Sequence, residues 1–185
     1  TGQEIARVGR DGDGFSVEAN GETHRAPALV IATGGPSIPK MGATGFAYDL
    51  ARQFGLKVVE PRPALVPLTL GGEDVLFREL SGVSAPVEAQ AGKAKFREAA
   101  LLTHKGLSGP AILQASSYWR HGEVLRIDFL PDLPRGWLIA RKGETPKASV
   151  TGVLREHLPE RLADTLAGRL GLEGPLQGLS DKALQ

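Results

Sequence analysis

The residues best suited to hold a ligand are the glycines that end a short apolar run. Ala28-Leu29-Val30-Ile31-Ala32 is apolar and rich in β-branched side chains, and Thr33-Gly34-Gly35 closes it. Such a run is typical of a strand buried on both faces. Terminal glycines let a planar ligand or another backbone come close. Because ligands of open α/β sheets sit beyond the carboxyl ends of the strands, we predict a ligand edge at Ala32, Thr33, Gly34 and Gly35.

A glycine-rich loop follows, from Gly34 to Gly45. A P-loop is excluded because Lys40 is followed by Met41 and Gly42, not by the Ser or Thr that the motif requires. The dinucleotide fingerprint Gly-x-Gly-x-x-Gly is matched only in part, by residues 42–45. One interpretation is a surface turn. The other is that Thr44 and Gly45 open a helix whose first amides and positive dipole face an electron-rich ligand.

A second candidate site lies in Leu101–Pro110, which has the pattern strand, tight turn, helix. A nucleophile elbow needs Gly-x-Ser-x-Gly, and Pro110 stands where its last glycine belongs. A serine hydrolase is therefore the weakest of the functional hypotheses, and labelling of Ser108 by a fluorophosphonate would revive it. The simpler interpretation of this segment is a helix start with a capping residue, with His104 at the end of a strand. The alternative is that His104 and Ser108 line a substrate pocket for an anionic or carbonyl group.

Composition excludes several other classes of site. The chain of 185 residues has no cysteine, so disulfides, thiolate zinc sites and a cysteine nucleophile are excluded. The four histidines have no metal-site spacing, and we predict no metal. The net charge of +1 gives no reason to expect a nucleic-acid or membrane partner. No apolar run reaches the ~18 residues of a membrane span. We expect a cytoplasmic protein acting on a small molecule; the oligomeric state is open.

The elements that would position the ligand edge are a β-meander and a helix. Ile5–Val8, Phe15–Ala19 and residues 22–26 are predicted strands, and Asn20-Gly21 is typical of a type I′ hairpin turn. Phe46–Phe54 is a predicted helix that Gly55 ends. Leu56–Val59 is predicted to be a short strand, and Pro61 and Pro63 mark a boundary after it.

The rest of the chain divides into a strand-rich and a helical part. The predicted strands are 64–70, 82–89, 99–104 and 124–130, with a helix over 110–120, where proline fits the first helical position. From Pro146 the pattern is helical, with a break at Pro159 and a stop at Gly171. The carboxylates and arginines at 155–156 and 160–161 are interpreted as a solvated helix face. The first residues of the sequence are already typical of a strand, and Ser180–Gln185 are typical of a helix start. We therefore expect this sequence to be a piece of a longer protein.

Three strings together resemble one bacterial family. They are residues 28–48, Pro63–Leu68 and Thr103–Pro110. The family consists of flavoproteins of the two-dinucleotide-binding-domain type and includes an aminoacetone oxidase and a bile-acid dehydro-reductase. The resemblance implies an α+β (mixed) fold. In it, residues 1–63 form part of an FAD-binding domain with a β-meander and buried strand, 64–140 an inserted β-rich, barrel-like domain, and 141–185 the start of a helical segment.

The same resemblance implies an FAD-dependent oxidoreductase, with NAD(P)H as a candidate reductant. Thr33, Gly34 and Gly35 would lie by the cofactor, Ile5 would meet adenine through its backbone, and Thr44 and Gly45 would start the helix near the flavin. The family's N-terminal Gly-x-Gly-x-x-Gly, which supplies amides for the pyrophosphate, is absent from this sequence. We therefore expect the chain alone to bind FAD weakly and to be inactive. The alternative hypothesis is a non-catalytic module that binds a ligand or a protein.

Overall fold

The structure is a computed structural model that describes residues 2, 4–37, 40 and 44–185. The chain divides into two compact units, residues 1–62 (unit 1) and residues 63–185 (unit 2). Helices and strands are mixed, as the sequence predicted for an α+β protein. None of the helices in the described part combines the length and the apolar character needed to cross a bilayer.

Unit 1 begins with the predicted meander. Strands β1 (Ile5–Asp11), β2 (Gly14–Ala19) and β3 (Glu22–Ala26) form an antiparallel sheet in the order β1-β2-β3. Asn20 and Gly21 both have positive φ, at 49° and 84°. That backbone is what a type I′ hairpin requires, so the turn prediction is confirmed.

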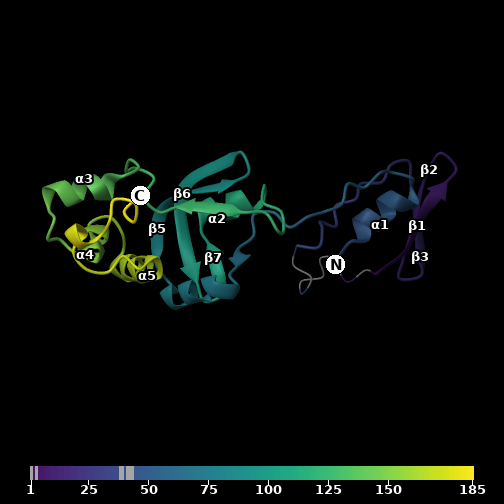
Figure 1. The fold of residues 1–185 in the computed structure, drawn as a ribbon. Helices are drawn as coiled ribbons and strands as arrows, with labels where there is room; N and C mark the ends of the chain where they lie inside the picture. Colours follow the sequence, from purple (N-terminus) through teal and green to yellow (C-terminus); the bar gives the residue numbers. More distant parts are fainter. Residues whose placement is uncertain (1, 3, 38–39, 41–43) are drawn as a thin grey trace. The chain divides into compact units, whose positions relative to one another are not determined.

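Helix α1 (Phe46–Gln53) lies beside this sheet (Figure 1). Leu50 is buried, and Phe54 meets Phe15 of β2 edge-on, with ring centroids 5.9 Å apart. Gln53 Nε2 donates a hydrogen bond of 2.7 Å to the carbonyl of Val8 in β1. Gly55 follows at φ 75°, so the predicted helix and its glycine stop are confirmed.

The prediction of a buried strand at residues 28–32, closed by Thr33–Gly35, is wrong. These residues form no strand, and Val30 is 86% exposed. The strand predicted at Leu56–Val59 is also absent, and Leu56 and Val59 are exposed. A strand buried on both faces needs paired neighbours and cover on each face. Among the described residues of unit 1, no segment pairs with either stretch.

Unit 2 is built on a curled five-stranded antiparallel sheet (Figure 1). Its order is β4-β7-β6-β5-β8, and the sheet resembles half of a barrel. The strands are β4 (Leu68–Thr69), β5 (Ser84–Ala91), β6 (Ala94–Thr103), β7 (Gly106–Ser108) and β8 (Leu125–Asp128). The 3-10 helix η2 (Gly72–Leu80) joins β4 to the β5–β6 hairpin. The sequence analysis missed η2 and the first half of β6.

Helix α2 (Pro110–Ser116) packs on the inner face of this sheet. Proline occupies its first turn as predicted, although the helix ends earlier than residue 120. Ile112 is fully buried, and the facing strands carry small residues such as Ala89 and Ala100. Alanines there let the helix approach closely. At Gly109, a Cβ would come within 2.7 Å of the Ala99 carbonyl oxygen, so glycine is required.

The C-terminal part of unit 2 is helical, as predicted. It contains α3 (Trp137–Glu144), α4 (Val150–Arg155), α5 (Glu160–Leu170) and the 3-10 helix η3 (Leu176–Gly178). Ser149 caps α4, its hydroxyl accepting a 3.0 Å hydrogen bond from the Gly152 amide. Pro159 separates α4 from α5, and Gly171 ends α5 at φ 63°. Helix α3 was missed.

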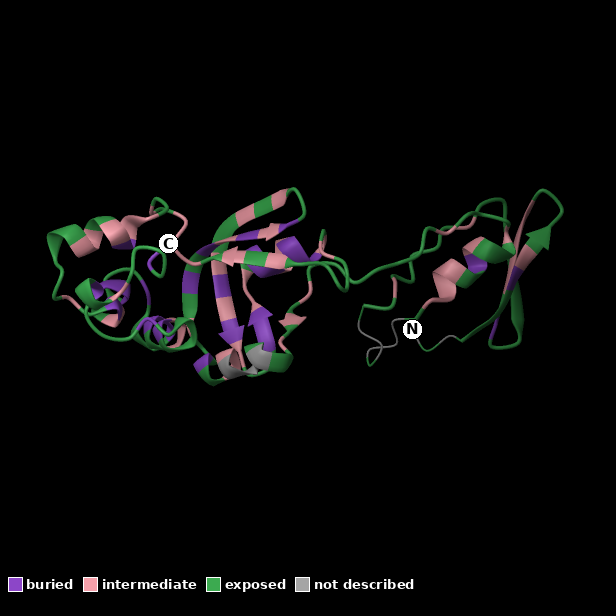
Figure 2. Cartoon of the chain, viewed as in Figure 1, coloured by how far each residue is buried: buried purple, intermediate pink, exposed green. Residues whose placement is uncertain are grey.

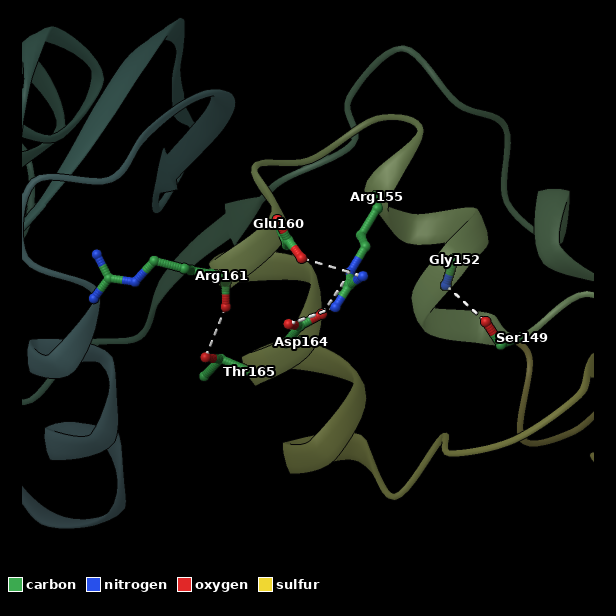
Figure 3. A network of polar contacts seen from close by, with 7 residues as sticks. All are labelled: Ser149, Gly152, Arg155, Glu160, Arg161, Asp164 and Thr165. Atoms are coloured by element: carbon green, nitrogen blue, oxygen red, sulfur yellow. Dashed lines mark hydrogen bonds and ion pairs between the residues drawn. The ribbon is translucent and has the colours of Figure 1, made fainter.

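An ion-paired bridge links α4 to α5 across Pro159 (Figure 3). Arg155 donates from Nε and from a terminal nitrogen to the two carboxylate oxygens of Asp164, at 2.9 and 2.8 Å, and pairs with Glu160 at 3.2 Å. These hydrogen bonds lower the pKa of Asp164 below its ordinary value. The predicted solvated face is therefore organised by a bidentate contact.

One hydrophobic cluster joins the sheet, α2 and the C-terminal helices. It includes Val87 of β5, Ile112 of α2, Val153 of α4 and Leu162 of α5. Figure 2 shows the buried residues along these elements. The sheet and the helices of unit 2 are thus stabilised by the same core. The boundaries expected at residues 63 and 140 stay predictions.

Candidate functional site

The predicted flavin residues of unit 1 lie at two short segments that we call the glycine corner: Thr33–Gly35 and Thr44–Gly45. Gly45 is the N-cap of α1, and its carbonyl accepts hydrogen bonds from the amides of Tyr48 and Asp49 at 2.8 and 3.1 Å. Thr44 Oγ1 accepts a 3.4 Å hydrogen bond from the Phe46 amide. The helix start is thus formed as predicted. Met41, Gly42 and Ala43 of the glycine-rich loop lie outside the described residues.

Tyr48 brings the two halves of the glycine corner together. A Cβ on Gly35 would lie 3.0 Å from the Tyr48 hydroxyl oxygen, and a Cβ on Gly45 would lie 3.9 Å from Cδ2 of the same ring. Gly34 has φ 71° and open space around it. The sequence analysis missed Tyr48, although its place one turn into the predicted helix put it near Gly45.

The remaining residues predicted to lie by the flavin, Ile5 and Ala32, are exposed. Ile5 starts β1 opposite Ala19, where the register of the sheet shifts, and 40% of it is exposed. Ala32 and Thr33 are exposed in an irregular segment. A cavity of about 450 Å³ lies beside them, lined by Leu29 and Ile31 but not by Ala32–Gly35. The described residues therefore offer a glycine turn and a helix start but no enclosure, and by themselves they do not fit a bound FAD.

His104 and Ser108 belong to a tight turn in unit 2. Thr103 Oγ1 holds the turn, accepting from the amides of Lys105 and Gly106 at 3.3 and 3.1 Å and donating to the Gly106 carbonyl at 3.0 Å. His104 is exposed in the turn, and Ser108 is half-buried at the end of β7. Among the described residues no hydrogen bond joins the two side chains. Their substrate-pocket role stays a prediction.

A concavity of unit 2 lies inside the curled sheet, and we call it the barrel cavity. Its volume is about 480 Å³. Both edge strands contribute to it, β4 from one side and β8 from the other. The lining is mostly apolar, with three aromatic rings and a small polar group: Leu68, Leu70, Leu102, Leu107, Leu125, Ile127, Phe77, Trp119, Phe129, Pro67, Thr69, Asp74, His121 and Glu123.

The polar side chains of the barrel cavity are held in place. Trp119 Nε1 donates a 2.8 Å hydrogen bond to the Glu123 carbonyl, and Glu123 Oε2 accepts from the Arg120 amide at 3.0 Å. Asp74 pairs with Arg169 of α5 at 2.7 Å. The sequence analysis did not single out this cavity. Its one local signal was the run Trp119-Arg120-His121-Gly122-Glu123 between a helix and a strand.

Curated relatives match nearly the whole chain. It is 44% identical over 169 residues to a protein of Escherichia coli named ribosomal RNA dihydrouridine synthase, covering 88% of this chain and 42% of that protein. A protein of the same name from Haemophilus influenzae is 40% identical over 153 residues, with 81% and 38% covered. A 3-dehydro-bile acid delta(4,6)-reductase of Clostridium scindens is 29% identical over 144 residues, with 72% and 35% covered. The chain spans less than half the length of each.

A family model matches residues 62–185, which form two thirds of the sequence and nearly coincide with unit 2. The model describes an HI0933-like protein barrel and H2TH domain, a family of the FAD-dependent oxidoreductase superfamily. The expected bile-acid reductase relative is found, but the two ribosomal RNA enzymes are more similar and were not anticipated. With its curled sheet followed by helices, this chain belongs to the HI0933-like family.

Proposed function

We propose that this chain is an internal part of a flavin-dependent enzyme that reduces a uridine of ribosomal RNA to dihydrouridine. The observation that carries the proposal is the 44% identity over 169 residues to the Escherichia coli ribosomal RNA dihydrouridine synthase, which spans both units. The oxidoreductase superfamily supports the same class of chemistry. Formation of dihydrouridine adds a hydride and a proton to the C5–C6 double bond of uracil, and a reduced flavin is a donor of that class.

The glycine corner is the part of this chain that we assign to the flavin. Gly34 leaves space for a planar ring, and the first turn of α1 presents backbone amides toward the same corner. Enclosure of FAD requires further polypeptide, because Thr33, Gly34 and Thr44 are exposed here. In this proposal NAD(P)H reduces the flavin. The exposed apolar segments 28–35 and 56–59 become inner strands of the completed flavin domain.

This function departs from the expectation that the chain has no nucleic-acid partner. That expectation rested on the net charge of +1, which describes the whole surface and not any one patch. RNA that is read through unpaired bases depends on stacking and hydrogen bonding to base edges as well as on phosphate contacts. A balanced charge is therefore compatible with an RNA substrate.

A second candidate, reduction of a small molecule, is favoured by the Clostridium scindens relative. At 29% identity it is more distant than the two ribosomal RNA enzymes, so we rank it lower. It keeps the small-molecule substrate that the sequence analysis expected.

The test is complementation. The full-length gene product is expressed in an Escherichia coli strain lacking its own ribosomal RNA dihydrouridine synthase, and dihydrouridine in purified ribosomal RNA is quantified by nucleoside mass spectrometry. We expect dihydrouridine to return. A Gly35→Val variant, which clashes with Tyr48, should lose bound flavin and product together, while Gly143→Ala, at an open position in α3 without positive φ, should retain both.

Two outcomes would contradict the proposal. A folded, flavin-loaded protein that restores no dihydrouridine would refute RNA as the substrate, and NAD(P)H-dependent reduction of an unsaturated steroid by the same protein would establish the second candidate. A folded full-length protein that binds no flavin would refute both and favour the non-catalytic module.

A further inference from the structure

The barrel cavity has the size and construction of a small-molecule site. Its volume of about 480 Å³ falls in the range of roughly 300–1,000 Å³ that ligand pockets occupy. Leu102 and Leu107 of adjacent strands are buried in the core and contribute to its lining. The two edge strands β4 and β8 bound it without pairing with each other. The gap between them leaves a way in for a ligand.

The aromatic side chains favour a flat ligand. Phe77, Trp119 and Phe129 come from three separate segments and all line the cavity. The indole N–H of Trp119 is already used in the 2.8 Å hydrogen bond to the Glu123 carbonyl, so the ring has a fixed orientation and offers a ligand its π face. His121 lies next to it, with ring centroids 6.2 Å apart. Such faces stack on planar heterocycles with little dependence on their identity.

The polar groups of the lining determine which part of a ligand the barrel cavity can accept. Asp74, Glu123 and Thr69 supply oxygen acceptors, and two of these residues are acidic. Carboxylates accept hydrogen bonds but repel an anion, which excludes a phosphate from the cavity. The charge of Asp74 is compensated by Arg169, 2.7 Å away. Because only Asp74 is compensated, the site suits a ring with N–H groups on its edge, and a cationic amine is the competing ligand.

We propose that the barrel cavity binds one unpaired nucleobase of the RNA substrate. The base stacks on Trp119, with its N–H groups directed to the carboxylates of Asp74 and Glu123 and its ribose phosphate left outside. This inference rests on the proposed function, because ribosomal RNA is what supplies the base. The cavity is a base-holding site in unit 2, separate from the glycine corner to which we assign the flavin.

The two tryptophans of the chain make the test direct. Trp119 lines the cavity, whereas Trp137 lies in α3, edge-on to His157 at 5.2 Å. In a Trp137→Phe variant, fluorescence reports on Trp119 alone. Uridine 5′-monophosphate, adenosine 5′-monophosphate and ribose 5-phosphate are titrated in parallel. We expect saturable quenching by both nucleotides and none by ribose 5-phosphate, which carries the phosphate without a base.

Variants then test the contact by calorimetric titration of the same nucleotides. Trp119→Ala should weaken binding about 5- to 150-fold, the range that corresponds to ~1–3 kcal/mol per stacked base, and Trp119→Phe should restore most of it. Tyr118→Ala is the matched control, because this neighbouring ring is exposed and does not line the cavity. Far-UV circular dichroism checks that each variant is folded.

Three results would overturn the inference. They are no response to either nucleotide in folded protein, an equal response to ribose 5-phosphate, and saturation by putrescine where nucleotides have no effect. The last would identify a cation site. Because these titrations measure binding of free nucleotides to this chain, their failure would leave the complementation result unchanged. Loss of complementation would likewise leave the titrations standing.

Discussion

Units 1 and 2 differ in how much of their apolar surface each one buries. In unit 1 the buried hydrophobic residues of the described part are Val8, Ala19 and Leu50, while Val30 and Val59 are 86% and 81% exposed. In unit 2 a single cluster runs from the sheet through α2 to the last helices. Similar apolar runs are therefore exposed in unit 1 and buried in unit 2. A run is buried only where the chain also supplies the surface that covers it.

The largest expected effect is truncation of the core of unit 2. Ile112 is fully buried between α2 and the sheet, so Ile112→Ala should lower the free energy of unfolding by about 2–5 kcal/mol. Val30→Ala in unit 1 removes an exposed side chain and should change it by less than ~0.5 kcal/mol. Urea unfolding followed by circular dichroism measures both. Equal losses would show that unit 1 buries Val30 after all.

A backbone contact in the sheet comes next. At Gly106, a Cβ would lie 2.1 Å from the Leu68 carbonyl oxygen, so Gly106→Ala must push β4 away from β7. We expect a loss of about 1–3 kcal/mol, as for other overpacked sites. Gly34→Ala in unit 1 also has positive φ but open space, and should lose only the ~1–2 kcal/mol of the left-handed conformation. A smaller loss at Gly106 than at Gly34 would reverse the comparison.

The smallest effect concerns the bridge between α4 and α5. Hydrogen bonds from Arg155 lower the pKa of Asp164, so the pair stabilises the fold above the unfolded pKa of this carboxyl and is lost as pH falls through its folded pKa. The thermal midpoint of Asp164→Asn should lie slightly below that of the unmodified chain at neutral pH, and the two should converge in acid. Asp13→Asn, in a turn of unit 1, is the control. A difference that persists in acid would mean that the substitution acts through packing.

Local patterns predicted most elements that need only nearby residues. The Asn20-Gly21 turn, the stop of α1 at Gly55, the proline start of α2 and the breaks around α5 each depend on backbone preferences within a few positions. Residues 28–32 and 56–59 were predicted as strands, mainly from their apolar character. An apolar run indicates that other residues must cover it. It does not show whether the same chain supplies those residues.

The candidate sites were less predictable than the fold. Gly34, Gly35 and Gly45 could be singled out from the sequence because they belong to a cluster of glycines. Tyr48, which contacts both segments of the glycine corner, could not. The barrel cavity is built by side chains from β4, η2, β6, β7 and β8 that are far apart in the sequence. Only the curl of the sheet brings them together with residues 119–123, so that short run alone could not have indicated the cavity.

Hydrogen exchange monitored by mass spectrometry tests the central claim most directly. The claim is that unit 2 buries its apolar residues in one core, whereas unit 1 leaves the apolar segments 28–35 and 56–59 uncovered. In this chain we expect amides in β5, β6 and α2 to be strongly protected and amides in 28–35 and 56–59 to exchange at nearly unfolded rates. In the full-length gene product these two segments should become protected. Strong protection of 28–35 in this chain, or no gain in the full-length protein, would contradict the account.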